Sequence, residues 1–149
     1  MIIIGYQGIG KSTLAKSNLK YIDLESGNFF VNGVRADDWY KTYVQIAKHL
    51  SEQGYVVFVS SHKVVRDALK GIGVPVGACF PITDLKEEWI SKLQKRYDES
   101  KLDKDYRALM NAKDRYVENI NEINDDCDRY QFYKFVIDDI DYTLEHCIS

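Results

Sequence analysis

The chain has 149 residues, of which 45% are hydrophobic and 13% aromatic, and it carries a formal net charge of −3. A chain of this size and composition can bury the core of a single domain over residues 1–149, which excludes an intrinsically disordered protein. The acidic balance disfavours nucleic acid as a partner without excluding it, and the lack of a ~20-residue apolar run predicts no membrane partner.

Short apolar runs alternate with longer segments of helical spacing, which is typical of an α/β domain with a mainly parallel sheet. The apolar runs predict strands over residues 1–4, 21–24, 55–59, 74–80 and 132–137. The segments of helical spacing predict helices over residues 11–19, 37–53, 64–70, 106–124 and 142–147, and a further helix that follows residue 84. The run at 55–59 does not alternate with polar residues, as expected for a strand that is covered on both faces.

The helix after residue 84 opens with a recognisable start signal. Asp84 and Glu87 have the spacing of a capping box and follow Pro81. The helix then carries an apolar stripe of Leu85, Trp89, Leu93 and Tyr97. In the next helix we expect five apolar side chains to face inward, namely Leu109, Tyr116, Val117, Ile120 and Ile123. Because the chain from 84 to 115 is its most charged part, we predict a mobile helical appendage on the sheet.

A glycine-rich loop lies between the first predicted strand and the first predicted helix. Residues 5–12 read Gly-Tyr-Gln-Gly-Ile-Gly-Lys-Ser and satisfy GxxxxGK[ST] at every fixed position. Such a loop turns backbone N–H groups around phosphate oxygens, and glycine adopts the necessary backbone angles without a Cβ clash. The helix that begins at Lys11 adds its positive N-terminal dipole.

This motif predicts a binding site for ATP and Mg²⁺. Lys11 is expected to reach the β- and γ-phosphates, and the Ser12 hydroxyl is expected to bind Mg²⁺. The predicted nucleotide-binding residues are Gly8, Ile9, Gly10, Lys11, Ser12 and Thr13.

The tighter pattern GxxGxGKST, which runs from Gly5 to Thr13, resembles the loop of the small P-loop kinases, such as shikimate, gluconate and adenylate kinases. Outside the loop, the resemblance covers the chain only through its length and order of elements. It implies a P-loop kinase-like, three-layer α/β/α fold with a five-stranded, mainly parallel sheet and the loop strand at its centre. It also implies a helical lid over about 84–115, and an enzyme that moves the γ-phosphate of ATP to a small acceptor bound above the strand ends.

The resemblance also suggests roles for acidic residues at the end of the second predicted strand. In shikimate-type kinases an acidic residue at this place contacts the acceptor or the magnesium shell. Asp23 or Glu25 is therefore expected to orient or deprotonate an acceptor hydroxyl. The alternative is that both side chains cap a loop or face solvent.

Small polar residues follow the third predicted strand, where motor ATPases and GTPases usually place an aspartate for magnesium. Their presence disfavours a switch or motor protein. Ser60 or Ser61 could hold a water molecule on the metal, and His62 could touch the acceptor, although a single histidine in a loop is more often structural.

Further charged residues are candidates for binding the acceptor and the phosphates. Arg35, Asp37 and Asp38 lie where such kinases bind their acceptor, and Arg35 could pair with an acceptor phosphate or carboxylate or simply lie on the surface. Arg66 is a weaker candidate of the same kind. In the lid segment Lys92, Lys95 and Arg96 lie off the apolar stripe and are expected to face outward. For stabilising the transferred phosphoryl group, Arg96 is the first candidate and Arg107 the second.

Several alternatives remain open at this stage. A nucleoside or nucleotide is the favoured acceptor and a sugar acid the next. A 5′-polynucleotide kinase and a non-catalytic ATP-binding regulatory protein are the competing functions. Tyr142 could stack on the nucleotide base or pack the terminal helix. The cysteines at 79, 127 and 147 show no pairing pattern, so we predict reduced thiols and a cytoplasmic protein of undetermined oligomeric state.

Overall fold

A computed structural model describes residues 1–29 and 36–149 of the chain. The sheet consists of β1 (Ile2–Gly5), β2 (Tyr21–Asp23), β3 (Val56–Val59), β4 (Val76–Pro81) and β5 (Tyr133–Ile137), in the order β2-β3-β1-β4-β5. All four strand pairs are parallel. The predicted α/β class and five-stranded sheet are confirmed, with the strand that precedes the glycine-rich loop at the centre.

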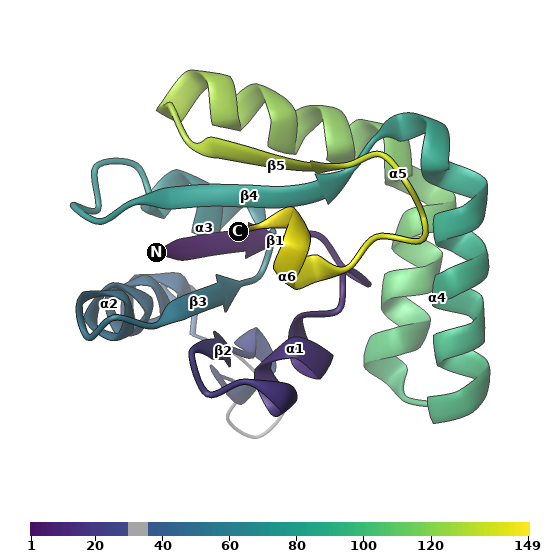
Figure 1. The fold of residues 1–149 in the computed structure, drawn as a ribbon, viewed down its shortest axis with the longest axis horizontal. Helices are drawn as coiled ribbons and strands as arrows, with labels where there is room; N and C mark the ends of the chain where they lie inside the picture. The colour runs from purple at the N-terminus through teal and green to yellow at the C-terminus, as the bar shows by residue number, and fades with distance from the viewer. Residues whose placement is uncertain (30–35) are drawn as a thin grey trace.

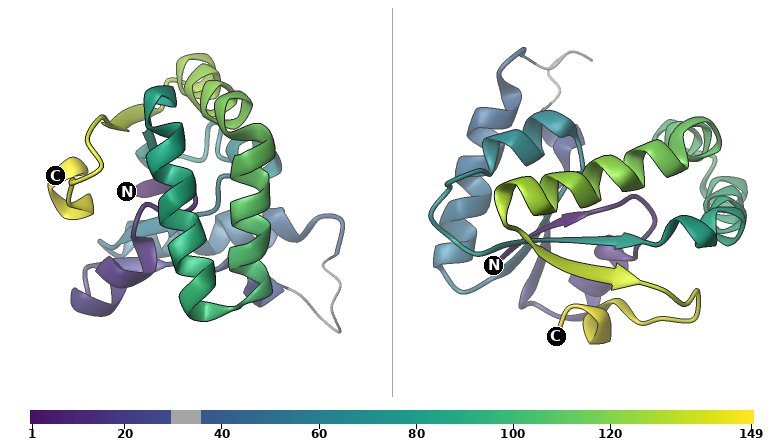
Figure 2. Two further views of the ribbon diagram at one scale, coloured as in Figure 1. Left: turned by 90° about the vertical axis from the view of Figure 1, so that its right-hand side faces the viewer. Right: turned by 90° about the horizontal axis from the view of Figure 1, so that it is seen from above.

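Helices cover both faces of this sheet. The α-helices of the described chain are α1 (Lys11–Ser17), α2 (Trp39–Glu52), α3 (Lys63–Ala68), α4 (Lys86–Ser100), α5 (Asp103–Tyr130) and α6 (Leu144–Cys147). Helices α1 and α6 lie on one face, and α2, α3 and the second half of α5 lie on the other (Figures 1 and 2). Two short 3₁₀ turns, η1 (Ser26–Phe29) and η2 (Thr83–Leu85), precede α2 and α4.

The core follows from the apolar strands. Ile2, Ile3 and Ile4 of β1 are at most 1% exposed, and residues 57–59 of β3 are fully buried, as expected for strands covered on both faces. All three cysteines are free thiols. No helix in the described residues is both long enough and apolar enough to cross a membrane.

Helix α4 and the first half of α5 form an antiparallel hairpin beyond the carboxyl ends of the strands (Figures 1 and 2). The turn between them contains Lys101, whose φ of 56° ends α4 in the left-handed region. Helix α5 spans 28 residues and is interrupted at Arg115, where φ is −139° and the backbone is not helical. The hairpin is therefore bounded by η2 at one end and by this kink at the other.

Two details of the predicted helices are wrong. The Asp84–Glu87 capping box is absent, because Asp84 lies within the 3₁₀ turn η2 and α4 begins after Leu85 without a side-chain cap. Val117 is 38% exposed, because its neighbour Tyr116, 1% exposed, takes the core position just after the kink.

Candidate functional site

A cavity of about 910 Å³ lies between the glycine-rich loop and the α4–α5 hairpin, at the carboxyl edge of the sheet. The ends of β2 and β3 also contribute to its wall. The predicted site residues that line it are Gly8, Gly10, Lys11, Ser12, Thr13, Asp23, Glu25, His62, Arg96 and Arg107. In an open parallel sheet, ligands bind outside the carboxyl ends of the strands, which is where this cavity lies.

Two glycines of the loop are required by its geometry. Gly8 has a φ of 86°, and a Cβ at this position would lie 2.9 Å from Cδ2 of Leu93 and 3.2 Å from Nε1 of Trp89. Gly10 precedes α1 with a φ of 104°. Both conformations disfavour residues with a Cβ, and the close approach of α4 further excludes a side chain at position 8.

Two aromatic side chains hold the backbone of the loop from outside. The indole N–H of Trp89 donates to the carbonyl of Gln7 at 2.9 Å, and the hydroxyl of Tyr142 donates to the carbonyl of Ile9 at 2.6 Å. In a trans peptide unit the N–H points opposite to the C=O. The following N–H group in each case therefore points away from the aromatic ring, which is the orientation that an anion cradle needs.

The α4–α5 hairpin also contacts the loop through Gln7. The Gln7 amide donates to the carbonyl of Ala108 at 3.0 Å and to Oδ1 of Asn111 at 3.1 Å. The ring of Tyr6 packs between Trp89 and Tyr116, and its burial raises the pKa of its phenol to about 12. The hairpin is thus docked on the loop through both of its helices.

Lys11 occupies the centre of the site. It is partly buried, its stem passes over Gly5, and its Nζ lies 3.4 Å from the Gly5 carbonyl oxygen. Burial lowers the pKa of Lys11, while the charges of Asp23 and Glu25 act in the opposite direction. An anion bound against Lys11 would oppose the effect of burial in the same way.

The two predicted acids, Asp23 and Glu25, lie at the carboxyl end of β2. Hydrogen bonds of Tyr43 fix this end of the strand. The Tyr43 hydroxyl donates to the Leu24 carbonyl at 2.6 Å and accepts the Ser60 N–H at 2.9 Å, so it ties the ends of β2 and β3 together. Burial raises the pKa of Asp23, and the positive charge of Lys11 opposes this rise. The charge of Glu25 and a hydrogen bond between Glu25 and Asp23 raise the pKa of Asp23 further.

The same wall could hold Mg²⁺ beside bound phosphates. The Ser12 hydroxyl and the carboxylates of Asp23 and Glu25 supply oxygen atoms, which Mg²⁺ prefers. The described chain contains no group of three or more His, Cys, Asp or Glu residues that could hold a metal ion without other ligands. Mg²⁺ usually keeps several water molecules and binds one or two protein groups plus substrate phosphates, so the residues present fit it.

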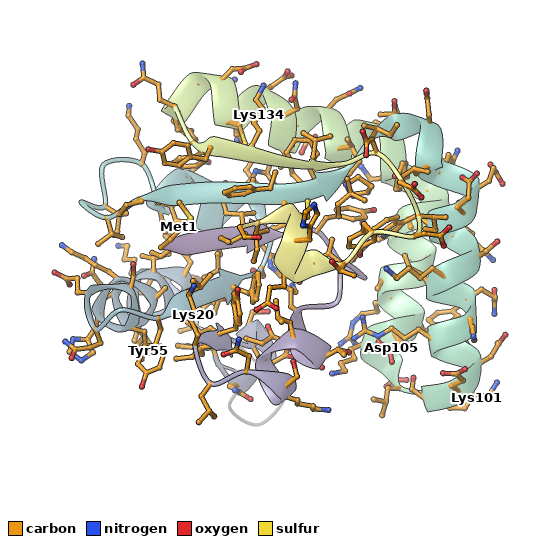
Figure 3. The ribbon with its side chains drawn as sticks, in the orientation of Figure 1. Met1, Lys20, Tyr55, Lys101, Asp105 and Lys134 are labelled. Carbon is orange, nitrogen blue, oxygen red and sulfur yellow. The ribbon has the colours of Figure 1, made fainter. Side chains whose placement is uncertain are left out.

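The charge of the wall is opposite to that of the whole chain. The net charge of the chain is −3, whereas the cavity is lined by three carboxylates and five Lys or Arg side chains, namely Lys11, Lys92, Arg96, Lys104 and Arg107. Arg96 Nε lies 2.9 Å from Oδ1 of the buried Asp105. Figure 3 shows Asp105 on the side of the hairpin that faces α1, whereas Lys101 lies at its tip.

The side chains of the hairpin differ from the expectation in one respect. Lys92 is half-buried instead of facing outward, because the ring of Tyr142 from the far end of the chain lies beside it. Lys95 is exposed and does not line the cavity. Tyr142 stacks on Trp89, with ring centroids 5.9 Å apart and planes 17° from parallel.

Four other predicted site residues within the described chain do not line the cavity, namely Ile9, Asp38, Ser61 and Arg66. Ile9 is buried in the core with its carbonyl facing Tyr142. Arg66 is 4% exposed, pairs with Asp126, and donates to the Ser61 carbonyl. Asp38 precedes α2 on the surface, and Arg35 lies outside the described residues.

His62 does line the cavity, and its position is supported by several contacts. Its Nδ1 lies 2.7 Å from the Ser60 hydroxyl, and its ring meets that of Trp39 edge to face at 5.6 Å.

The first half of α5 supplies further wall residues; the sequence predicted Arg107 among them but not Lys104, Ala108 and Asn111. Lys104, Arg107, Ala108 and Asn111 all line the cavity. Their spacing of three, four and seven residues is that of one helix face. This polar face was a usable signal, and extending the predicted helix three residues toward its N-terminus would have included Lys104.

Comparison of the chain with models of known protein families and with curated proteins found no match. The chemistry of the cavity is therefore the guide to function. A basic wall, a loop with inwardly available N–H groups and a pair of acids can bind a polyphosphate and take a proton from a neighbouring hydroxyl.

Proposed function

We propose that the protein is a P-loop phosphotransferase that moves the γ-phosphate of ATP to a small acceptor, with a nucleoside or nucleotide as the favoured acceptor class. The observation that carries the proposal is the convergence of Lys11, Asp23 and Arg96 on one cavity from three separate parts of the fold. A phosphate loop alone would support binding, whereas an acid and further cations around the same space also support transfer.

In the proposed reaction each side chain acts on charge or protons. The loop N–H groups and Lys11 bind the β- and γ-phosphates, and the carboxylate of Asp23 or Glu25 takes the proton of the acceptor hydroxyl. The acceptor oxygen forms a bond to the γ-phosphorus as the bond from that phosphorus to the β–γ bridging oxygen breaks, and ADP leaves. When bound, Mg²⁺ neutralises phosphate charge and orients the phosphate oxygens. Arg96 and the other cations of the hairpin stabilise the negative charge of the transferred phosphoryl group. The hairpin acts as the lid that limits access of water.

The test is phosphoryl transfer from Mg·ATP, read by mass spectrometry over nucleosides, nucleoside monophosphates, sugar acids and oligonucleotides. Lys11→Ala should abolish product formation. Lys16→Ala removes an exposed lysine from the last turn of the same helix, and this variant should still form product.

A phosphorylated small acceptor that depends on Lys11 would establish the proposal. A phosphorylated oligonucleotide would favour the 5′-polynucleotide kinase. ATP binding without transfer to any acceptor would overturn the enzymatic proposal in favour of a nucleotide-binding regulatory protein.

A further inference from the structure

Lys92 has an environment unlike that of the other cations on the wall. Its Nζ donates to the Tyr142 hydroxyl at 2.9 Å and lies 4.5 Å from the Trp89 ring centroid and 4.8 Å from that of Tyr142. The two rings are stacked, so the ammonium group lies against both. Aromatic rings hold a cation in place without neutralising its charge.

The donors of Lys92 are only partly used. A lysine ammonium has three N–H donors, and one of them is directed to Tyr142. No ion pair within residues 1–29 and 36–149 includes Lys92, whereas Arg96 on the next turn is paired with buried Asp105. A half-buried cation with unused donors and no carboxylate partner favours an anion in the cavity that it lines.

The groups that hold Lys92 also hold the glycine-rich loop. Tyr142 donates to the carbonyl of Ile9, and Trp89 donates to that of Gln7. The ammonium group is thus two hydrogen bonds from the loop backbone, through a single hydroxyl. Its position relative to the loop is set by the same side chains that orient the loop.

We infer that Lys92 binds the triphosphate of the donor and that Tyr142 is the positioning residue that holds it over the loop. This inference rests on the proposed function and replaces Arg96 by Lys92 as the principal lid cation in the ground state. Burial and the charge of Arg96 lower the pKa of Lys92, and the negative charge of a bound polyphosphate would act in the opposite direction.

The test is isothermal titration calorimetry of the full chain with inorganic tripolyphosphate and, separately, Mg·ATP. Lys92→Met keeps much of the stem and removes the charge, so both ligands should bind about tenfold to a hundredfold more weakly, as expected for loss of a charge-assisted hydrogen bond. The control is Lys95→Met, the same change at an exposed position of the same helix outside the cavity, and it should bind as wild type. Equal affinities of Lys92→Met and Lys95→Met would overturn the inference.

A second variant tests the positioning role independently. Tyr142→Phe keeps the ring stack but removes the hydroxyl that links Lys92 to the loop, so it should also weaken tripolyphosphate binding. In Lys92→Met the further change Tyr142→Phe should cost much less than it does alone, because the two residues act together. Fully additive effects would overturn the positioning role.

Lys11→Ala distinguishes a failure of this inference from a failure of the proposed function. If Lys11→Ala abolishes binding and Lys92→Met has no effect, the inference fails and the phosphate site stands. If Lys11→Ala has no effect on tripolyphosphate or ATP binding, the proposed function fails, and the inference fails with it.

Discussion

Nε of Arg66 lies 2.7 Å from Oδ2 of Asp126, and the two residues are 4% and 3% exposed. This pair joins α3 to the second half of α5 through residues sixty positions apart in sequence. The same guanidinium donates to the carbonyl of Ser61, directly before His62 of the cavity wall. Arg66 therefore supports the wall from behind, and its donors face away from the space in which we had expected it to bind an acceptor.

Breaking this pair should lower stability strongly. Asp126→Ala leaves the Arg66 guanidinium buried without its nearest carboxylate, so the free energy of unfolding should fall by about 3–5 kcal/mol, measured by urea denaturation. Asp128→Ala is the matched control, because Asp128 is exposed and pairs with Lys134 at 2.7 Å on the surface. Its loss should lower the free energy of unfolding by less than about 1 kcal/mol. Similar losses in the two variants would contradict this view of the pair.

The close approach of α4 to Gly8 should make this position intolerant of a methyl group. In Gly8→Ala the new Cβ would meet buried Leu93, so the loop or α4 must shift, and binding of Mg·ATP measured by calorimetry should be lost. Gly54→Ala introduces a Cβ at a similar φ of 96° with no atom within 4 Å. It should lower the free energy of unfolding by roughly 1 kcal/mol through backbone strain and leave binding unchanged. Retention of ATP affinity in Gly8→Ala would show that the contact with α4 is not required.

Asp105 should control the order of the hairpin tip. Its carboxylate accepts bonds from Arg96 and from the Ser100 hydroxyl, and Ser100 in turn accepts the Leu102 N–H at 3.2 Å. Asp105→Ala removes both of these interactions with the carboxylate. Amide hydrogens in peptides covering 95–106 should therefore exchange at least about tenfold faster. Asp103→Ala changes an exposed acid in the same first turn of α5 and should leave exchange there nearly unaltered. Equal protection in the two variants would assign the order of the tip to apolar packing instead.

The sequence predicted the elements whose signals are local. The loop from Gly5 to Ser12, the strand before it and the helix after it were all placed correctly, because periodicity and glycine positions suffice there. The kink at Arg115 was missed, because neither glycine nor proline marks it, and the inward pattern across it included Val117 in error.

The candidate site was less accessible to sequence reasoning wherever it depends on distant partners. Nothing near Arg66 indicates that Asp126 neutralises it, and nothing near Lys92 indicates that Tyr142 lies beside it. Helical spacing gives the face on which a side chain lies, whereas burial also depends on what the rest of the chain places against that face.

Asp23 should set the low-pH limit of phosphoryl transfer. A general base acts as its carboxylate, and burial raises the pKa of Asp23 above the ordinary 3.8. With an acceptor identified by mass spectrometry, the turnover rate should therefore fall as pH is lowered through this raised pKa. Asp23→Asn should lower the rate by roughly 10²–10⁴-fold, abolish this limb of the pH profile and leave ATP binding intact.

Glu25→Gln provides the matched test of the sign. Because the charge of Glu25 and its hydrogen bond raise the pKa of Asp23, their loss should lower that pKa and move the acidic limb of the rate profile to lower pH. Loss of the limb in Glu25→Gln with its retention in Asp23→Asn would assign the role of base to Glu25. A shift of the limb to higher pH in Glu25→Gln would contradict the tuning role. The two isosteric variants thus separate the acid that takes the proton from the acid that tunes it.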